Sequence, residues 1–307
     1  MIDQIAVEEL ERSQAGLAPA PARAGRSYWA ESFDRLRDNR IGVFAGYLIL
    51  FLALVAILAP AISALGTHFD PTRQDLDSQF LGPGRPHWLG ADETGRDTLT
   101  RLIYGARVSL GVGFLTVGLQ IVVGGSVGLL AGYFGRWADG VLMRIVDMVL
   151  AVPPIFLFIL MSILFRPNAL TLSAIIASVN WGVVARLVRG EVLSVKNRDF
   201  ILATRSLGAS NLRLMLRHLL PNVLPVMIVA ASLGVGAIIL VEAALDFLGL
   251  GIAPPTPSWG NMLSNSQTYY EHSTWLVVFP GVMIFVTVLA ANLFGNAVRD
   301  AFDPRLR

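Results

Sequence analysis

The polar stretch Leu187-Val-Arg-Gly-Glu191, together with Asp199-Phe-Ile-Leu-Ala-Thr-Arg-Ser-Leu-Gly-Ala-Ser210, lies between two long apolar runs. It is basic, and its apolar residues recur at the spacing of a helix. Basic loops of membrane proteins concentrate on the cytoplasmic side. The stretch therefore predicts a helical, membrane-spanning chain with a structured cytoplasmic loop, residues 187–220, on which another protein docks.

The composition also indicates a membrane protein. Of the 307 residues, 54% are hydrophobic and 15% are charged, whereas soluble domains carry about 25% charged residues. The chain has no cysteine, so disulfides and thiol chemistry are excluded. Its 4 histidines are scattered without the spacing of metal ligands, and we expect no metal site.

Six apolar stretches are long enough to cross a bilayer, which takes about 20 residues in a helix. We expect spans near residues 41–62, 108–133, 141–165, 169–187, 222–245 and 275–297. The predicted fold class is an all-α, polytopic membrane protein with six transmembrane helices. Its expected parts are a cytoplasmic tail with a possible interfacial helix (1–40), the first transmembrane helix (41–62), an outer loop with an amphipathic helix at 96–107 (63–107), and a five-helix core that includes the docking loop (108–307).

The distribution of basic residues predicts that both ends of the chain are cytoplasmic, because arginine and lysine concentrate on that side. In this orientation eighteen of the 24 basic residues lie in inner segments. The outer ones are Arg73, Arg85, Arg96, Arg101, Arg107 and Arg166. Since residues 246–274 contain neither lysine nor arginine, that loop fits the outer side.

In the docking loop, Phe200, Ala203 and Leu207 share one face of an expected helix. Gly208 is expected to end this helix, because glycine adopts the left-handed conformation of a helix terminus. Two amphipathic helices at a membrane also fit a second interpretation, in which they lie among the lipid headgroups. The pattern alone does not choose between docking and lipid binding.

A second helix is expected after the glycine, capped by Ser210 or Asn211 and ended by Pro221 before the fifth span. Its apolar stripe comprises Leu212, Met215, Leu216 and Leu219. The loop is thus predicted to be helix, glycine break, second helix and membrane span.

Gly124, Gly128 and Gly132 recur every four residues in the second span, a pattern that lets helices approach closely in lipid. We expect this face to pack on another helix. Arg144 and Asp147, three residues apart in the third span, are expected to form an ion pair.

Three polar residues in the spans are candidates for a substrate path. Glu242 and Asp246 lie four residues apart at the outer end of the fifth span, facing either a path or an aqueous vestibule. Asn180 is a third candidate, although a hydrogen bond between helices explains it better than a contact with substrate.

Enzyme chemistry finds little support in the sequence. No G-x-x-x-x-G-K-[ST] sequence occurs, and the single lysine, Lys196, follows a valine, so the chain has no P-loop for ATP. The sequence Gly124-Gly-Ser126-Val-Gly128 matches a nucleophile elbow, but the serine lies inside an apolar helix without histidine and acidic partners. We expect no catalytic residue.

The docking loop resembles that of the inner-membrane permeases of bacterial ABC importers. Their loop reads Glu-Ala-Ala, a spacer, Gly, a longer spacer and apolar-Leu-Pro, and Ala203, Gly208, Leu220 and Pro221 match this pattern. Leu202 stands where the family usually has glutamate, and Thr204 stands where it has alanine.

Further segments, in matching order over roughly 85–307, resemble the second, C-type permease of the dipeptide and oligopeptide subfamily. They are residues 87–97, 101–109, 132–135, 186–191, 247–251, 254–262 and 299–307. Residues 1–40 carry no such motif.

The resemblance implies a type I ABC importer permease in the bacterial inner membrane that moves peptide-like solutes. It also implies a second permease subunit, two P-loop ATPase subunits that bind ATP and Mg, and an extracytoplasmic solute-binding protein. This chain itself is expected to bind membrane lipid but no cofactor and no nucleic acid. The residues expected to dock on an ATPase are Phe200, Leu202, Ala203, Thr204, Arg205, Leu207, Gly208, Ala209, Arg217 and Pro221.

The alternative is a secondary transporter or channel that works alone. That class predicts inverted repeats and charges near the middle of the membrane. The two halves of the sequence show no clear repeat, and the charges lie toward the ends of the spans.

Overall fold

The structure, a computed structural model, describes residues 28–264 and 266–303, whose regular structure is helical. The longer helices are α2 (Tyr28–Asp38), α3 (Arg40–Ile57), α5 (Thr98–Phe134), α6 (Arg136–Ala151), α7 (Pro154–Phe165), α8 (Ala169–Val195), α9 (Asp199–Ser206), α11 (Leu220–Phe247) and α13 (Trp275–Phe302). The short ones are α4 (Ala59–Ile62), α10 (Asn211–Arg213), α12 (Ser266–Tyr269), the π-helical turns Ser63–Thr67 and Leu214–Leu219, and the 3₁₀ turns Leu76–Ser78 and Asn261–Leu263. Of the predicted tail, residues 1–27 lie outside the described residues, and α2 occupies the place of the expected interfacial helix.

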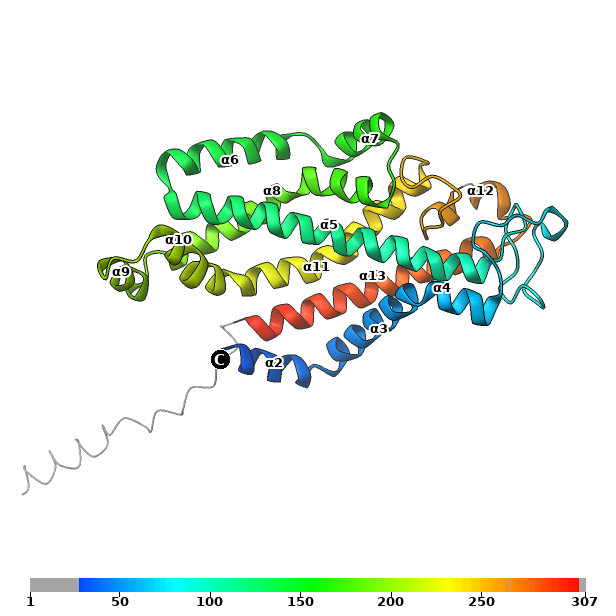
Figure 1. Ribbon diagram of the computed structural model, residues 1–307, viewed down its shortest axis with the longest axis horizontal. Coiled ribbons are helices and arrows are strands. Elements are labelled where there is room, and N and C mark those ends of the chain that lie inside the picture. The colour runs from blue at the N-terminus through cyan, green and yellow to red at the C-terminus, as the bar shows by residue number, and fades with distance from the viewer. Residues whose placement is uncertain (1–27, 265, 304–307) are drawn as a thin grey trace, which may run out of the picture.

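The described helices provide five candidate membrane spans, or six if one bent pair counts as a span. α3, α5, α8, α13 and the continuous segment 211–247 are each long and apolar enough to span a membrane, and α6 and α7 form a further pair bent by 82°. Figure 1 shows α6 starting at the end of the bundle where α5 finishes, and α7 lying at the end where α8 starts. The bend falls at Pro153 and Pro154, whose rings disrupt helical hydrogen bonding.

Both described ends of the chain lie on the same side of the bundle. The Tyr28 hydroxyl, at the start of α2, donates to the Phe302 carbonyl, at the end of α13, over 2.8 Å. An even number of crossings follows, which agrees with the six predicted spans when α6 and α7 together count as one.

The start of α5 corrects the expectation of a separate amphipathic helix over residues 96–107. Thr98 begins a 37-residue helix that runs without a break through the second span. Asp97 caps it, because its Oδ2 accepts a hydrogen bond from the Thr100 backbone N–H at 2.8 Å. Arg101 in this segment is buried and forms an ion pair with Asp92, so its charge is neutralised inside the protein and not by exposure to water.

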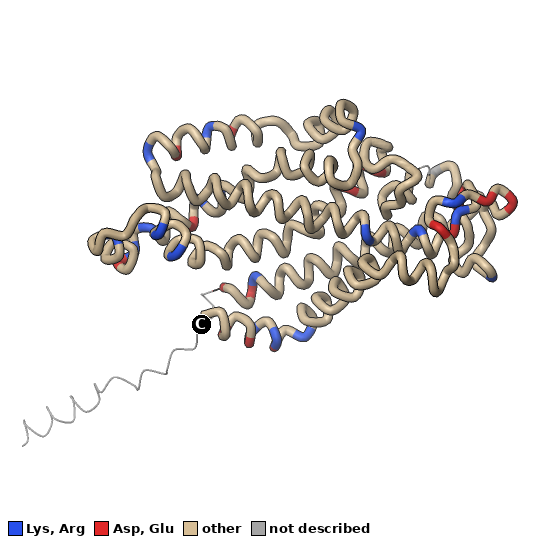
Figure 2. The backbone as a smooth tube through the Cα atoms, viewed as in Figure 1, with Lys and Arg blue, Asp and Glu red and all other residues tan. Residues whose placement is uncertain are grey.

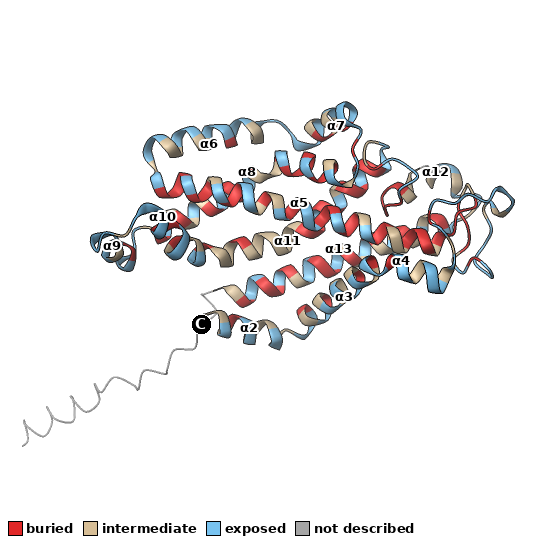
Figure 3. Ribbon diagram, in the orientation of Figure 1, coloured by how far each residue is buried: buried red, intermediate tan, exposed pale blue. Residues whose placement is uncertain are grey.

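α5 is the central helix of the bundle, and Figure 3 shows buried residues along its length. Gly124, Gly128 and Gly132 face α8, which confirms the predicted close packing. A β-carbon at Gly128 would lie 2.5 Å from the carbonyl oxygen of Ala185 and 2.8 Å from Val188 Cβ. Because these distances are shorter than non-bonded contact, only glycine fits at this crossing.

We expect Gly128→Ala to destabilise the protein by about 2 kcal/mol, because the added methyl group forces α5 and α8 apart. Gly118→Ala is the matched control, since no atom lies within 4 Å of a β-carbon at that position of the same helix. The measurement is the thermal unfolding midpoint of each purified variant in mild detergent. Equal midpoints for the two variants would contradict the close packing.

Charged residues gather at the two ends of the bundle and leave its middle largely uncharged (Figure 2). One predicted ion pair is wrong. Asp147 pairs with Arg186 of α8, with Oδ1 and Nη2 2.6 Å apart, and not with Arg144 of its own helix. Arg144 lies three residues before Asp147 on the same helix. The packing of α6 against α8 places Arg186 within ion-pair distance of Asp147 instead.

Candidate functional site

α9 projects from one end of the bundle, between the end of α8 and α10 (Figure 1). One side chain, Ile201, anchors it, and this side chain is fully buried. Ile201 belongs to the same apolar cluster as Val195 of α8 and Leu214 and Leu219 of the π-helical turn. The orientation of α9 is therefore tied to the two spanning segments on either side of it.

The outward face of α9 is apolar and uncovered. Leu207 is 89% exposed, Leu202 45% and Phe200 41%. Single exposed apolar residues are ordinary, but three within one short projecting element indicate an interaction surface. Arg205 lies beside this face, with its guanidinium carbon 5.6 Å from the centre of the Tyr133 ring.

The predicted glycine break is present after α9. Gly208 has φ +81°, the left-handed region that glycine adopts without strain. Its N–H donates to the Arg205 carbonyl at 3.0 Å. The Ser210 hydroxyl oxygen then accepts a hydrogen bond from the Arg213 N–H at 3.4 Å, so Ser210 caps the next helix, as the sequence predicts.

The expectation that Pro221 ends the second helix is wrong. Residues 211–247 form one helical segment, with the π-helical turn Leu214–Leu219 just before the proline. In this turn the Leu220 N–H donates to the Met215 carbonyl, five residues earlier. The wider turn changes the hydrogen-bond register ahead of Pro221, so that the missing N–H does not stop the helix.

The expected stripe on the second helix is correct only in part. Met215 and Leu219 are buried, as is Leu214, which the pattern did not include. Leu212 and Leu216 are instead more than half exposed. The π-helical turn rotates the faces of the helix, and a periodicity of 3.6 residues therefore mislocates them.

Polar contacts to α5 and α6 fix the base of the loop. The Lys196 ammonium donates to the Gly132 carbonyl at 2.8 Å, and the Tyr133 hydroxyl donates to Asn211 Oδ1 at 2.7 Å. Arg189 of α8 forms a two-pronged ion pair with Asp139 of α6. These contacts were not predicted from the sequence. The single lysine of the chain, Lys196, was the one feature of the loop that could have indicated them.

The predicted docking residues occupy one end of the molecule. Eight are exposed and two, Thr204 and Ala209, are half-buried. The exposed ones are Phe200, Leu202, Ala203, Arg205, Leu207, Gly208, Arg217 and Pro221. The Thr204 hydroxyl donates to the Phe200 carbonyl at 2.6 Å within α9, so it stabilises the helix itself.

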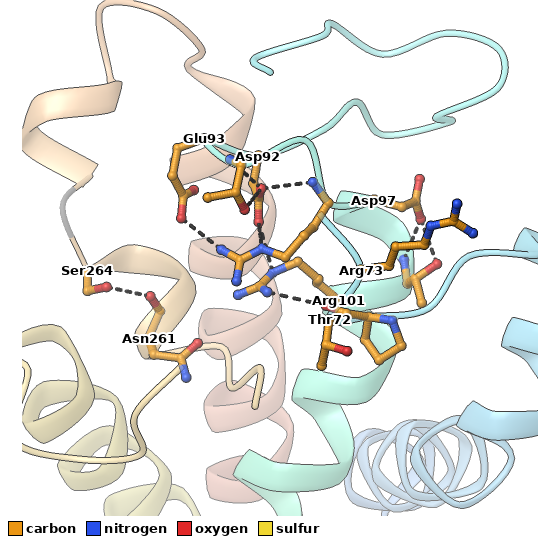
Figure 4. Close-up of polar contacts among 12 residues, drawn as sticks. Thr72, Arg73, Asp92, Glu93, Asp97, Arg101, Asn261 and Ser264 are labelled. Atoms are coloured by element: carbon orange, nitrogen blue, oxygen red, sulfur yellow. Dashed lines mark hydrogen bonds and ion pairs between the residues drawn. The ribbon is translucent and has the colours of Figure 1, made fainter. Parts of the chain in front are cut away.

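The opposite end is held by a buried ion-pair network (Figure 4). Asp92 Oδ2 accepts a hydrogen bond from Arg96 Nε at 2.8 Å and lies 3.2 Å from Arg101 Nε. Glu93 Oε1 accepts from Arg96 Nη2 at 2.9 Å. Arg101 also donates to the Pro71 carbonyl at 3.4 Å. The network ties the outer loop of residues 68–97 to the start of α5.

Two further contacts order the outer loop. His87 Nδ1 lies 3.0 Å from Asp97 Oδ1, and the His87 ring stacks on Phe69 with centroids 4.4 Å apart. At the loop surface, hydrogen bonds from the Thr72 hydroxyl and backbone hold the pKa of Asp70 below its usual value. The motif at residues 87–97 thus builds an ordered, largely buried structure.

Glu242 and Asp246 are buried in α11, under the loop of residues 251–261. Glu242 Oε1 accepts a hydrogen bond from the Ser109 hydroxyl at 3.1 Å. Asp246 accepts one from the Ile252 N–H at 2.6 Å and another from the Ser258 hydroxyl. In this conformation Asp246 holds the loop against the bundle, and Glu242 is bonded to α5.

Trp259 also attaches this loop to the bundle. Its side chain is fully buried, and its indole N–H donates to the Leu102 carbonyl of α5 at 3.0 Å. Its backbone N–H donates to the Ser109 hydroxyl at 3.2 Å. Gly105 lies under the indole, where a β-carbon would come within 3.0 Å of Trp259 Cδ1. The motif at residues 254–262 therefore joins α5 to α11.

The remaining candidates show no constellation of enzyme residues. Asn180 is half-buried in α8, and its side chain makes no hydrogen bond to the described residues, contrary to the expected bond between helices. The Ser126 hydroxyl donates to the Val122 carbonyl of its own helix at 2.6 Å. Among the described residues, no three histidine, aspartate or glutamate side chains gather as metal ligands.

Residues 124–307 match the family model described as binding-protein-dependent transport system inner membrane component. The match covers more than half of the chain. The chain belongs to this family. Residues 27–83 of this permease also match the N-terminal TM domain of oligopeptide transport permease C, so the relationship includes residues 27–40, where no motif was visible. As a member of the family, the chain is a transport component and not an enzyme.

Named relatives from other bacteria match nearly the whole length of the permease. The dipeptide transport system permease protein of Alkalihalophilus pseudofirmus is 41% identical over 92% of this chain and 91% of its own length. The glutathione transport system permease protein of Pectobacterium atrosepticum is 36% identical, over 96% and 98%. The oligopeptide transport system permease protein of Bacillus subtilis is 33% identical, over 96% and 95%.

A solved structure shares the fold of the permease. It is a chain of the MetNI methionine ABC transporter in inward-facing conformations, with a TM-score of 0.51 and 20% identity. The similarity covers 67% of this chain and 97% of that one. The fold is therefore that of an ABC importer permease.

Proposed function

We propose that the chain is the transmembrane subunit of an ATP-driven importer of peptide-like solutes in the bacterial inner membrane. The support for the solute class is that its relatives are named for dipeptides, oligopeptides and glutathione. The support for an ATP-driven mechanism is its membership of a binding-protein-dependent transport family and the lack of a P-loop in its own sequence. ATP and Mg are bound by partner ATPases.

The observation that carries the proposal is the uncovered apolar face of α9, together with Leu207, which directly follows the helix and is 89% exposed. We infer that this face enters a groove on an ATPase, in the manner of a helix docked by its apolar side. Ile201 and the contacts of Lys196 and Tyr133 fix α9 to the spans. A displacement of α9 is then passed to α8 and to segment 211–247 as a rigid-body movement, which alternates access to the path.

The complete assembly contains a second permease subunit, two ATPase subunits and an extracytoplasmic solute-binding protein. Large apolar side chains on α6 and α7 support further contacts in the membrane, with lipid or with the second permease. Trp137 is 81% exposed and Phe156 62%. The ordered outer loop, at the end opposite α9, is the surface available to the binding protein.

We propose that Asn180, Glu242 and Asp246 line the substrate path in another conformation of the permease. Here Asp246 is bonded to the loop of residues 251–261, and Glu242 is buried and bonded to Ser109 of α5. In an outward-open state that lifts this loop, they face the path.

The test is reconstitution. Liposomes that hold both permeases and both ATPases, with the binding protein outside and ATP inside, are expected to accumulate a labelled dipeptide. Omitting this chain or the ATPases is expected to abolish accumulation. Uptake by this chain alone, driven by a proton gradient, would overturn the proposal in favour of a self-sufficient transporter.

A further inference from the structure

A cavity of about 450 Å³ opens on the chain at the end opposite α9. It lies between the outer part of α5, the first turns of α8 and the loop that follows α11. Its walls are mostly apolar, including Val108, Leu115 and Leu170. Its size falls within the range of small-molecule sites.

Three polar side chains line this cavity without a side-chain partner among the described residues. They are Arg107, Tyr104 and Thr256. Within residues 28–264 and 266–303, the Arg107 guanidinium has no carboxylate within ion-pair distance, and neither hydroxyl makes a side-chain hydrogen bond. Every other arginine near the start of α5 is neutralised: Arg96 and Arg101 both pair with Asp92.

No acidic residue lines the cavity. The two acidic residues of α11 have other partners. Glu242 accepts a hydrogen bond from Ser109, and Asp246 accepts one from Ile252 in the loop of residues 251–261. The cavity therefore combines one uncompensated positive charge, two hydroxyl groups and apolar walls. That combination fits a small anion that also carries apolar groups.

We propose that this cavity is a subsite for the peptide on its way through the importer, in which Arg107 binds the free C-terminal carboxylate. A guanidinium binds a carboxylate through two parallel hydrogen bonds, which is the strongest such pairing available to a side chain. Tyr104 and Thr256 supply hydroxyl groups for the peptide amide, and the apolar walls receive a side chain. The proposal rests on the proposed function, because only a peptide-like solute brings this carboxylate.

The subsite is open on one side of this chain, so a second permease subunit is positioned to complete it. Thr256 lies in the loop that Asp246 and Trp259 hold in place. The sequence motif at residues 254–262 thus sets one wall of the cavity as well as closing the bundle. Movement of this loop would open or shut the subsite.

The first experiment measures ATP-driven uptake of the dipeptide Ala-Phe, below saturation, by the complete importer with wild-type binding protein. Arg107→Gln is expected to lower uptake about tenfold, because a charge-assisted pair is lost. Arg107→Lys, which keeps the charge, is expected to retain more activity. Arg166→Gln is the matched control, since Arg166 is an exposed arginine at the same end that does not line the cavity.

The second experiment uses the absence of cysteine from this chain. In the complete importer, Thr256→Cys is labelled with a membrane-impermeant thiol reagent, and labelling is read from the mass of this chain alone. Ala-Phe is expected to slow labelling, and its C-terminal amide is not. Protection is expected to disappear when Arg107→Gln is added.

The outcomes separate the two proposals. If the wild-type assembly shows no ATP-driven uptake of any peptide, the proposed function fails. If it transports Ala-Phe but Arg107→Gln matches wild type and peptide does not protect position 256, the subsite alone is overturned. Protection that depends on anionic lipid and not on peptide would show that Arg107 binds a headgroup, which also overturns the subsite.

Discussion

A Leu207→Asp substitution is expected to abolish uptake by the assembled importer while leaving this chain folded. Leu207 is 89% exposed, so the change removes no packing within the chain. In the proposed complex the same side chain is buried against an ATPase, where losing an apolar anchor costs about 2 kcal/mol or more. An unpaired carboxylate adds a desolvation cost. Together these predict at least about 30-fold weaker docking.

The measurement is uptake and solute-stimulated ATP hydrolysis by proteoliposomes that contain the complete importer. Leu65→Asp is the matched control, because Leu65 is 81% exposed in the turn Ser63–Thr67, at the opposite end of the bundle. The control is expected to bind the ATPases and to hydrolyse ATP like wild type. Wild-type coupling in Leu207→Asp, or equal losses in the two variants, would contradict a docking role for α9.

Asp92→Ala is expected to give the largest loss of stability among single substitutions in the outer loop. Asp92 is 4% exposed and interacts with both Arg96 and Arg101. Its removal leaves two buried arginines with only Glu93 and a backbone carbonyl as partners. Removing one member of a buried ion pair costs about 3–5 kcal/mol. For a chain of this size that corresponds to a fall of roughly 5–8 °C in the unfolding midpoint.

Two comparisons make this prediction specific. Asp92→Asn keeps an oxygen that can accept hydrogen bonds from Thr94 and the Arg96 backbone, so an intermediate loss is expected. Asp77→Ala removes an exposed carboxylate from the same loop and is expected to change the free energy of unfolding by less than about 0.5 kcal/mol. An Asp92→Ala variant as stable as Asp77→Ala would show that the network contributes nothing to stability.

The spans and their closest packing could be predicted from the sequence because they depend on local patterns. A run of about 20 apolar residues suffices to identify a spanning helix. A glycine at every fourth position suffices to identify a face of close approach. The break at Gly208 and the cap at Ser210 follow from conformational preferences of single residues, and both occur as expected.

Features that depend on contacts between distant segments could not be predicted. The sequence places acidic residues near Arg101, but it does not show that Arg101 and Asp92 are both buried in one ion-pair network. Asp147 pairs with an arginine 39 residues away, across two helices. The π-helical turn before Pro221 compensates for a residue that, judged alone, ends a helix.

The candidate site also contains residues that could be predicted from the sequence and residues that could not. The proposed docking residues could be selected from the sequence because helical spacing and a family motif coincide in one short segment. Arg107 was counted only as one of several outer arginines. What sets it apart is that Arg96 and Arg101, which precede it in the chain, are neutralised and it is not, which is a property of the folded structure.

The central claim is that this chain works as one subunit of an assembly whose ATPases are separate proteins. Its most direct test is affinity purification of the tagged chain from its native membrane in mild detergent, with every copurifying protein identified. We predict recovery of a second permease and of P-loop ATPases, and loss of the ATPases alone from the Leu207→Asp variant. Recovery of the folded wild-type chain by itself, still able to drive uptake after reconstitution, would contradict the claim.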